Sequence, residues 1–276
     1  MLSALGLFAA LDANSKLLSG AYPVAQVVLV RLVVVLALLL AARLVRPGTG
    51  GELGTRHPWL HLLRAAAMLG SAFGFFQALR EIPLAEGYLV YFTAPFMTLA
   101  LAALVLNEKL PRAVWLWSGV GFLGVLVAMA PGLQAGGSLL AYGYALLGTV
   151  SYALVLTVNR SLRHEAGVAR LVLWSALPGV LVLLPFTISA WVPPQGGDWL
   201  ALSVNGIFAG AATICLAVAF RHANAAQLAP LEFSALLWAM LADLAIWGVL
   251  PQTATLAGGI LVVAACVMSQ RARHHA

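Results

Sequence analysis

Charge is the property that this sequence has least of. Charged residues make up only 9% of its 276 residues, whereas 62% are hydrophobic. A soluble domain has about a quarter charged residues and roughly half apolar ones. No stretch between the apolar runs is long enough to fold as a separate soluble unit. The composition therefore excludes an ordinary water-soluble protein and predicts a chain that lies almost entirely in a lipid bilayer.

Cysteines are scarce, and the motifs of several enzyme classes are missing. Cys215 and Cys266 both fall in apolar runs, where a thiol behaves as a small hydrophobic group. The chain has no Walker-type phosphate loop, no His-Glu-x-x-His and no Gly-x-Ser-x-Gly. The stretch from Gly119 to Gly124 fits the dinucleotide fingerprint by letter, but it lies inside an apolar run with no preceding strand. We expect no enzyme, no ATP-driven pump, no cofactor and no metal site.

The net charge of +6 does not indicate a nucleic-acid partner. The Lys and Arg residues neither cluster on one basic helix nor alternate with aromatic residues on which bases could stack. At the N-terminus a basic region is missing and Asp12 lies in the first apolar run. We therefore interpret that run as a first membrane span and not as a cleaved signal peptide.

Ten apolar runs approach the roughly 20 residues that a helix needs to cross a bilayer. The connections between them are short, so helices that follow one another must be antiparallel neighbours. The sequence thus predicts an all-α integral membrane protein with ten transmembrane helices. The expected spans are Leu2 to Leu18, Pro23 to Leu44, Trp59 to Leu79, Leu84 to Leu106, Pro111 to Ala130, Leu139 to Val158, Val168 to Trp191, Trp199 to Phe220, Ala225 to Leu250 and Gln252 to Ser269.

Basic residues of the loops would lie on one side of such a bundle, with Arg80 alone on the other. Lys and Arg in short loops stay on the cytoplasmic side, so we expect both termini in the cytoplasm. Lys16, Arg31 and Arg64 fall within spans and do not enter this comparison. The loop residues on the expected cytoplasmic side are Arg43, Arg46, Arg56, Lys109, Arg112, Arg160, Arg163, Arg170, Arg221, Arg271 and Arg273.

The chain also repeats itself weakly. Ala78 to Arg80 align with Ala219 to Arg221 at an offset of 141 residues, and Pro111 aligns with Pro251 after one deletion. This alignment places the fourth and fifth spans opposite the ninth and tenth, so each half has five helices.

An odd number of helices makes the second half enter the membrane from the opposite side. We expect one membrane domain made of a first five-helix repeat, residues 1–134, and a second, inverted five-helix repeat, residues 135–276. Folds of this kind bind a substrate near the midplane between the repeats and move one repeat against the other. The repeat therefore favours a carrier without an energy source of its own, driven by a gradient.

Three stretches resemble the EamA-type branch of the drug/metabolite transporter superfamily. The first runs from Ile82 through Pro95 to Glu108 and Lys109, the second is Ala229 to Ala239, and the third is Arg31 with its two neighbours. The resemblance implies ten helices and small-molecule transport, often export, across a bacterial inner membrane. Within the superfamily the chain is most similar to bacterial amino-acid exporters, including exporters of aromatic amino acids.

The sequence departs from the family pattern at the end of the ninth span. Gly248, Val249 and Leu250 stand where family members often carry an acidic residue, which puts a role for Glu108 in doubt. Alternatives remain open: export of a nucleoside, a sugar or a cationic drug, a non-transporting scaffold or receptor, and an intramembrane enzyme. The expected partners are a small-molecule substrate and the lipid bilayer, with a monomer as the working interpretation.

Ionisable residues inside a membrane are costly unless they are paired or face a cavity. Asp12, Ser15 and Lys16 lie on one face of the first span, which indicates either a cavity lining or a self-neutralising pair. Arg31 lies well inside the second span, and pairing with Asp12 or Glu86 is its simpler explanation. Glu86 itself fits a role in complementing the dipole of its own helix.

The ninth span carries two acidic residues, Glu232 and Asp243, about three helical turns apart. Either carboxylate could couple transport to protons, although structural pairing is favoured for both.

Aromatic residues at helical spacing form a second candidate set. Tyr88, Tyr91 and Phe92 follow one another along the fourth span, while Tyr152 and Trp174 lie several residues inside theirs. An interfacial aromatic belt explains residues at span ends better than it explains these. The candidate substrate-binding residues are Asp12, Ser15, Lys16, Arg31, Tyr88, Tyr91, Phe92, Tyr152, Trp174 and Glu232.

Overall fold

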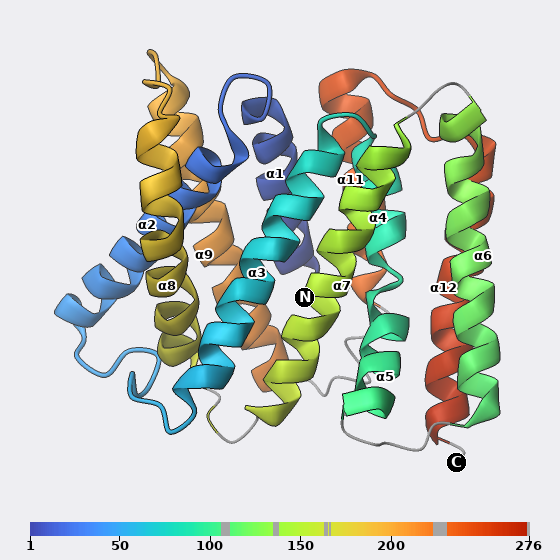
Figure 1. The fold of residues 1–276 in the computed structure, drawn as a ribbon, viewed down its shortest axis with the longest axis horizontal. Coiled ribbons are helices and arrows are strands. Elements are labelled where there is room, and N and C mark those ends of the chain that lie inside the picture. The colour runs from blue at the N-terminus through green and yellow to red at the C-terminus, as the bar shows by residue number, and fades with distance from the viewer. Residues whose placement is uncertain (106–110, 135–137, 163–164, 166, 223–230, 275–276) are drawn as a thin grey trace.

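The computed structural model describes residues 1–105, 111–134, 138–162, 165, 167–222 and 231–274. Within these ranges the chain forms helices and no strand, and the helices stand side by side as one bundle (Figure 1). Their bounds are α1 Leu2–Leu18, α2 Val24–Val45, α3 Pro58–Leu79, α4 Leu84–Tyr91, α5 Ala94–Val105, α6 Arg112–Gln134, α7 Leu139–Ser161, α8 Val168–Ser189, α9 Asp198–His222, α11 Ser234–Trp247 and α12 Thr253–His274.

The helices suit a bilayer. Among the described residues, seven helical segments are long and apolar enough to cross a membrane, and two shorter apolar helices lie within α11 and α12. Large apolar side chains such as Leu181, Phe186 and Ile260 are exposed on the outside of the bundle, where they would meet lipid. The all-α, multi-pass membrane architecture expected from the sequence is therefore confirmed.

The predicted fourth span is wrong in one respect, because it is not a single helix. It divides into α4 and α5 at Phe92 and Thr93. Pro95 has no N–H for an intrahelical hydrogen bond and disfavours helical geometry in the residue before it. The Thr93 hydroxyl and N–H both donate to the carbonyl of Val90, at 2.6 and 3.0 Å, and close the last turn of α4.

Most of the close helix packing joins a helix of residues 1–134 to a helix of residues 135–276. In Figure 1 the green α6 stands beside the red α12, and the blue α2 stands beside α8 and α9. The main pairs across the two parts of the chain are α6 with α12, α3 with α7, α1 with α9, α2 with α8, α2 with α9, α3 with α8, α1 with α11, α5 with α7, α4 with α11 and α4 with α7.

Glycines set the closest of these contacts. A β-carbon on Gly74 of α3 would lie 2.6 Å from the backbone nitrogen of Gly148 in α7, and one on Gly258 of α12 would lie 2.4 Å from the carbonyl oxygen of Gly124 in α6. A side chain at either position would push the two backbones apart. Small residues that let membrane helices approach in this way are typical of tight helix pairs.

Candidate functional site

A cluster of aromatic rings lies where α3, α4 and α7 meet. The rings of Tyr91 and Tyr152 are stacked with centroids 4.7 Å apart, and the Phe75 ring lies 5.3 Å from Tyr91 and 5.7 Å from Tyr88. Phe92 extends the cluster, 6.4 Å from Tyr88. Four of the ten candidate residues are therefore brought together here, although Phe75, which joins them, was not among the candidates.

A carboxylate and a guanidinium group lie beside this cluster. The Tyr88 hydroxyl donates a 2.7 Å hydrogen bond to Oδ2 of Asp12 on α1. Arg31 on α2 is near enough for its charge to attract that of Asp12, and its Cζ lies 4.9 Å from the centroid of the Phe76 ring. Asp12 and Arg31 are both half-buried. Asp12 thus contacts the aromatic cluster through Tyr88, and Arg31 lies near Asp12 on a second helix.

The pairing expected for Arg31, with Asp12 or Glu86, is present only as an attraction between the charges of Arg31 and Asp12. Neither carboxylate forms an ion pair with the guanidinium, since Asp12 accepts from Tyr88 and Glu86 accepts a 2.6 Å hydrogen bond from Tyr142 of α7. Among the residues that the structure describes, Arg31 has no hydrogen-bond or ion-pair partner. A half-buried guanidinium of this kind keeps five donors for a ligand.

The polar residues predicted to share one face of α1 contact different neighbours. Ser15 donates to the Leu11 carbonyl at 2.8 Å and accepts a 2.7 Å hydrogen bond from Asn205 of α9. Lys16 donates to the carbonyl of Ile82 at 2.9 Å, one helical turn beyond Asp12. Of these residues, only Asp12 contacts the aromatic cluster.

Two further candidates lie away from Asp12 and Arg31. The Trp174 indole N–H donates a 3.0 Å hydrogen bond to the carbonyl of Leu53, in the connection between α2 and α3, so Trp174 is not part of the cluster. Glu232 is exposed. Its neighbour Phe233 does reach the cluster, with its ring 5.7 Å from that of Phe92.

Asp243 of α11 joins three elements at one end of the bundle. Its two carboxylate oxygens accept the backbone N–H groups of Leu84 and Ala85 at 3.0 and 2.8 Å, and the Lys16 ammonium lies 3.8 Å from Oδ1. The first N–H groups of a helix have no partner within that helix and attract negative charge. Asp243 thus caps α4 from another helix. These four residues, the Asp243 network, confirm the structural pairing favoured for Asp243.

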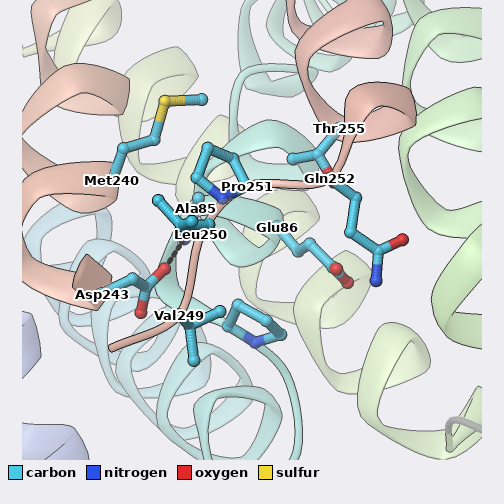
Figure 2. Close-up of a pocket in the computed structure, with 10 residues that line it drawn as sticks. Ala85, Glu86, Met240, Asp243, Val249, Leu250, Pro251, Gln252 and Thr255 are labelled. Atoms are coloured by element: carbon cyan, nitrogen blue, oxygen red, sulfur yellow. Dashed lines mark hydrogen bonds between the residues drawn. The ribbon is translucent and has the colours of Figure 1, made fainter. Parts of the chain in front are cut away.

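A small cavity of about 40 Å³ lies beside the Asp243 network. Asp243 and Glu86 both line it, together with Gln252, Thr255 and the connection between α11 and α12. In Figure 2 the side chains of Glu86 and Gln252 extend toward the same part of the cavity, away from Asp243. A space of this size can hold a water molecule when polar groups surround it.

Glu165, between α7 and α8, forms a second network at the other end of the bundle. It accepts the Thr55 hydroxyl, the Arg56 N–H at 2.8 Å and a contact from His61 at 3.4 Å, with Arg170 at 3.9 Å. The Thr55 hydroxyl and then the Arg56 N–H stabilise the charged carboxylate and hold the pKa of Glu165 at about 2. We call these five residues the Glu165 network.

The sequence analysis missed this second network because Thr55, Arg56 and Glu165 lie in predicted loops, while His61 and Arg170 lie near the starts of predicted spans. It also left Arg64 unassigned. Arg64 is 8% exposed and donates to Asn159 at 2.7 Å, to the Leu171 carbonyl at 3.1 Å and to the hydroxyl of Ser175. An arginine near the start of a predicted span was the available signal, since a buried guanidinium needs several acceptors. The motif at Glu108 and Lys109 lies outside the described residues.

Known proteins resemble this chain along most of its length. The model of the EamA-like transporter family matches residues 1–130 and 139–270. The S-adenosylmethionine uptake transporter of Rickettsia felis is 26% identical over 213 residues, which is 77% of this chain and 72% of the relative. The pseudopaline exporter CntI of Pseudomonas aeruginosa is 28% identical over 205 residues, 72% of this chain and 70% of the relative.

A solved structure supports the fold. It is the crystal structure of a protein that is 23% identical to this chain, and the match covers 99% of this chain and 98% of that one with a TM-score of 0.65. At this identity the likeness establishes the arrangement of the helices and says nothing of the substrate.

Proposed function

The chain belongs to the EamA-like transporter family, and from that premise we propose that it exports amino acids, aromatic ones included, across a bacterial inner membrane. It is a multi-pass membrane transporter whose relatives carry small metabolites. The substrate site we propose lies between α1, α2, α4 and α7, and alternating access between two inverted repeats would expose it to each side in turn.

The unpaired guanidinium of Arg31 carries this proposal. A free α-amino acid has a carboxylate and an ammonium group on one carbon atom. Arg31 offers donors for the carboxylate. Asp12 accepts one neutral hydrogen bond within the described part of the chain, from Tyr88, and so offers an acceptor for the ammonium. Binding both groups would neutralise two half-buried charges of the protein at once, which offsets the cost of burying them.

The aromatic cluster supports a substrate with an apolar or aromatic side chain. The stacked rings of Tyr91 and Tyr152 and the ring of Phe75 lie on the same elements that position Asp12 through Tyr88. Offset or edge-on contacts between aromatic rings contribute about 0.5 to 1.5 kcal/mol beyond the buried area. The cluster would therefore favour aromatic amino acids over small polar ones.

The named relatives support an amino-acid group in the substrate and leave the direction to be tested. S-adenosylmethionine, which the Rickettsia felis relative takes up, is itself an α-amino acid. The Pseudomonas aeruginosa relative is an exporter, and we propose that direction for this chain too. The gradient that drives it is taken up in the next subsection.

Helix packing supports the two inverted halves, residues 1–134 and 135–276. If the halves are exchanged, α1 takes the place of α7, α2 of α8, α3 of α9, α4 with α5 of α11, and α6 of α12. Under this exchange the pair α3 with α7 becomes α9 with α1, and α3 with α8 becomes α9 with α2. Likewise, α1 with α11 becomes α7 with α4 and α5, and the pairs α2 with α8, α6 with α12 and α4 with α11 return to themselves.

Orientation follows from the loop charges. With both termini in the cytoplasm, the Glu165 network lies at the cytoplasmic end of the bundle and the Asp243 network at the outer end. Each network then closes one side of the proposed site.

Transport by purified protein in liposomes tests the assignment. Labelled phenylalanine should enter down its gradient, whereas phenethylamine, which lacks the carboxylate, and 3-phenylpropionate, which lacks the ammonium group, should enter at least tenfold more slowly. Arg31→Gln should slow phenylalanine by a similar factor and leave the low phenethylamine rate unchanged, because that molecule has no carboxylate to lose a partner.

Arg46→Gln is the matched control. Arg46 is exposed at the end of the same helix, α2, and its replacement should leave all three rates unchanged. The panel also contains S-adenosylmethionine, a nucleoside and a cationic drug. If the nucleoside or the cationic drug were transported while no amino acid exceeded empty liposomes, the amino-acid assignment would be wrong.

A further inference from the structure

Glu86 and Asp243 line the same cavity but have very different partners. Each oxygen of Asp243 accepts a backbone N–H, and Lys16 adds a positive charge at 3.8 Å. Glu86 is only 7% exposed, and one of its oxygens accepts the Tyr142 hydroxyl. Its other oxygen has no partner among the residues that the structure describes. Within the described chain, both oxygens of Asp243 thus have hydrogen-bond donors, whereas only one oxygen of Glu86 has a donor.

The cavity itself provides an independent sign of a ligand. Thr255, which lines it, is 2% exposed, and within the described chain its hydroxyl has no hydrogen-bond partner. Gln252 contributes an amide from the same side, and the cavity has room for a water molecule. Buried polar groups without partners are costly, so a polar occupant that bonds Glu86 and Thr255 would remove an existing cost.

We propose that this cavity is a proton-binding site, at which Glu86 takes up one proton from the outer solvent in each transport cycle. The proposal rests on the transport function and the orientation proposed above, and it names the gradient that drives export. When two buried carboxylates share a site, the one with more donors stays ionised and the other changes its protonation state. Within the described chain, Asp243 has two backbone donors and a nearby ammonium group, whereas Glu86 has one donor.

The charges around Glu86 fit a single proton. The titratable groups that face it are Tyr142 from α7, Asp243 from α11 and Lys16 from α1. With Lys16 charged and both carboxylates ionised, the cluster carries one net negative charge, which one proton on Glu86 cancels. A neutral cluster is the form that a low-dielectric site favours.

A path for the proton leads through the connection between α11 and α12. Val249 and Leu250 of this connection line the cavity and are 39% and 69% exposed, so a short stretch of chain separates the cavity from solvent. On uptake an O–H bond forms on the Glu86 carboxylate with a proton from outer water. On release that bond breaks and the proton passes to cytoplasmic water, while the substrate moves outward.

The hydrogen bond from Tyr142 links the proton to the movement of the halves. Glu86 belongs to residues 1–134 and Tyr142 to residues 135–276, and the bond between them is 2.6 Å long. An ionised carboxylate accepts a stronger hydrogen bond than a neutral carboxyl group does. Protonation therefore weakens a contact that closes the outer side, and deprotonation restores it.

Transport against a gradient tests the proposal in proteoliposomes with the membrane potential clamped at zero. With the lumen one pH unit more acidic than the outside, the wild-type protein should concentrate phenylalanine inside about tenfold, the limit for one proton exchanged per substrate. Glu86→Gln keeps the side-chain length and should only equilibrate phenylalanine. Glu81→Gln, an exposed glutamate five residues earlier, is the matched control and should concentrate phenylalanine as the wild type does.

A second measurement does not depend on the substrate. Infrared difference spectra of the purified protein between acidic and neutral pH should contain a C=O stretch that belongs to the protonated carboxyl group of Glu86. Glu86→Gln should remove that band, and Glu81→Gln should keep it. A variant that no longer folds is recognised by a broadened size-exclusion profile, and the wild-type band with the Glu81→Gln control then carries the test.

The outcomes separate the two proposals. If the wild type equilibrates phenylalanine but ignores the pH difference, the proton site is overturned and the amino-acid function stands. A band that survives Glu86→Gln, or undiminished accumulation by that variant, also overturns the proton site. If no amino acid is transported, the proposed function fails, and the infrared band alone decides whether Glu86 binds a proton.

Discussion

Asp243 and Glu165 lie at opposite ends of the bundle, yet both reach from residues 135–276 to backbone N–H groups of residues 1–134. Asp243 accepts from Leu84 and Ala85, just after α3, and Glu165 accepts from Arg56, just before α3. Each carboxylate also has a basic side chain within 4 Å. They differ in burial, since the side chain of Asp243 is 3% exposed and that of Glu165 is 12% exposed.

This difference bears on the proposed transport cycle, in which each end opens in turn. Thr55, Arg56 and Glu165 of the Glu165 network lie in connections between helices, where water can replace their contacts. Asp243 is more deeply buried than Glu165, so water replaces its contacts less readily. In the proposed cycle, opening the end at Asp243 therefore requires that the charges of Asp243 and Lys16 stay together or be neutralised. The end at Glu165 needs less compensation.

The largest expected effect is that of Asp243→Ala. It leaves the N–H groups of Leu84 and Ala85 without acceptors and Lys16 without its carboxylate, which for a buried pair costs about 3 to 5 kcal/mol. The thermal midpoint in detergent should fall by roughly 5 to 10 °C. Asp198→Ala is the control on the same side, because among the described residues the carboxylate of Asp198 accepts one hydrogen bond, from the Tyr22 hydroxyl at 2.5 Å. Equal losses for both variants would mean that the Asp243 network contributes no more stability than that single hydrogen bond.

A double-mutant cycle on Lys16 and Asp243 measures how strongly their two charges stabilise the protein. It should show the next largest effect. Lys16→Met alone leaves Asp243 with two backbone donors and should cost about 1 kcal/mol. In Asp243→Asn the Lys16 charge is left uncompensated, so adding Lys16→Met should recover about 1 to 2 kcal/mol of the loss. Strict additivity of the two thermal shifts would mean that the 3.8 Å contact is energetically irrelevant.

The helices of this fold were predictable, and the networks were not. The bounds of α1 were predicted as they are, and those of α2 and α3 to within one residue, because each is a run of apolar residues ended by Pro, Gly or charge. The break between α4 and α5 was missed because hydropathy does not change there. Only the missing N–H of Pro95 marks it.

Part of the candidate site followed from helical spacing alone. Tyr88, Tyr91 and Phe92 share a face of the fourth span, and that face does contact Tyr152 and Asp12. Trp174 also lies several residues inside its predicted span, but its indole N–H donates to the carbonyl of Leu53, 121 residues away along the chain. No local pattern predicts such a contact, because it depends on how a connection folds back over the helix ends.

The smallest expected effect is at Glu165, which no sequence pattern marked. Its partners other than Arg170 lie 104 to 110 residues away along the chain, and it lies between two predicted spans. Thr55 and Arg56 donate to different oxygens of Glu165. Glu165→Gln keeps one acceptor oxygen, replaces the other by an NH2 group that cannot accept, and loses the charge. The Arg56 amide should then exchange its hydrogen severalfold faster, measured by hydrogen–deuterium exchange at pH 7.

The pH dependence at this end follows from the same carboxylate. Because the folded pKa of Glu165 is lowered from 4.5 to about 2, its stabilising contribution is complete above about pH 4.5 and is lost as the pH falls toward 2. Protection of the Arg56 amide, corrected for the intrinsic exchange rate, should be constant from pH 7 to 4.5 and then decline. Glu165→Gln should abolish the decline, whereas Glu52→Gln, whose side chain is 89% exposed, should retain it. A decline that begins well above pH 4.5 would exclude Glu165 as the group whose protonation releases this contact.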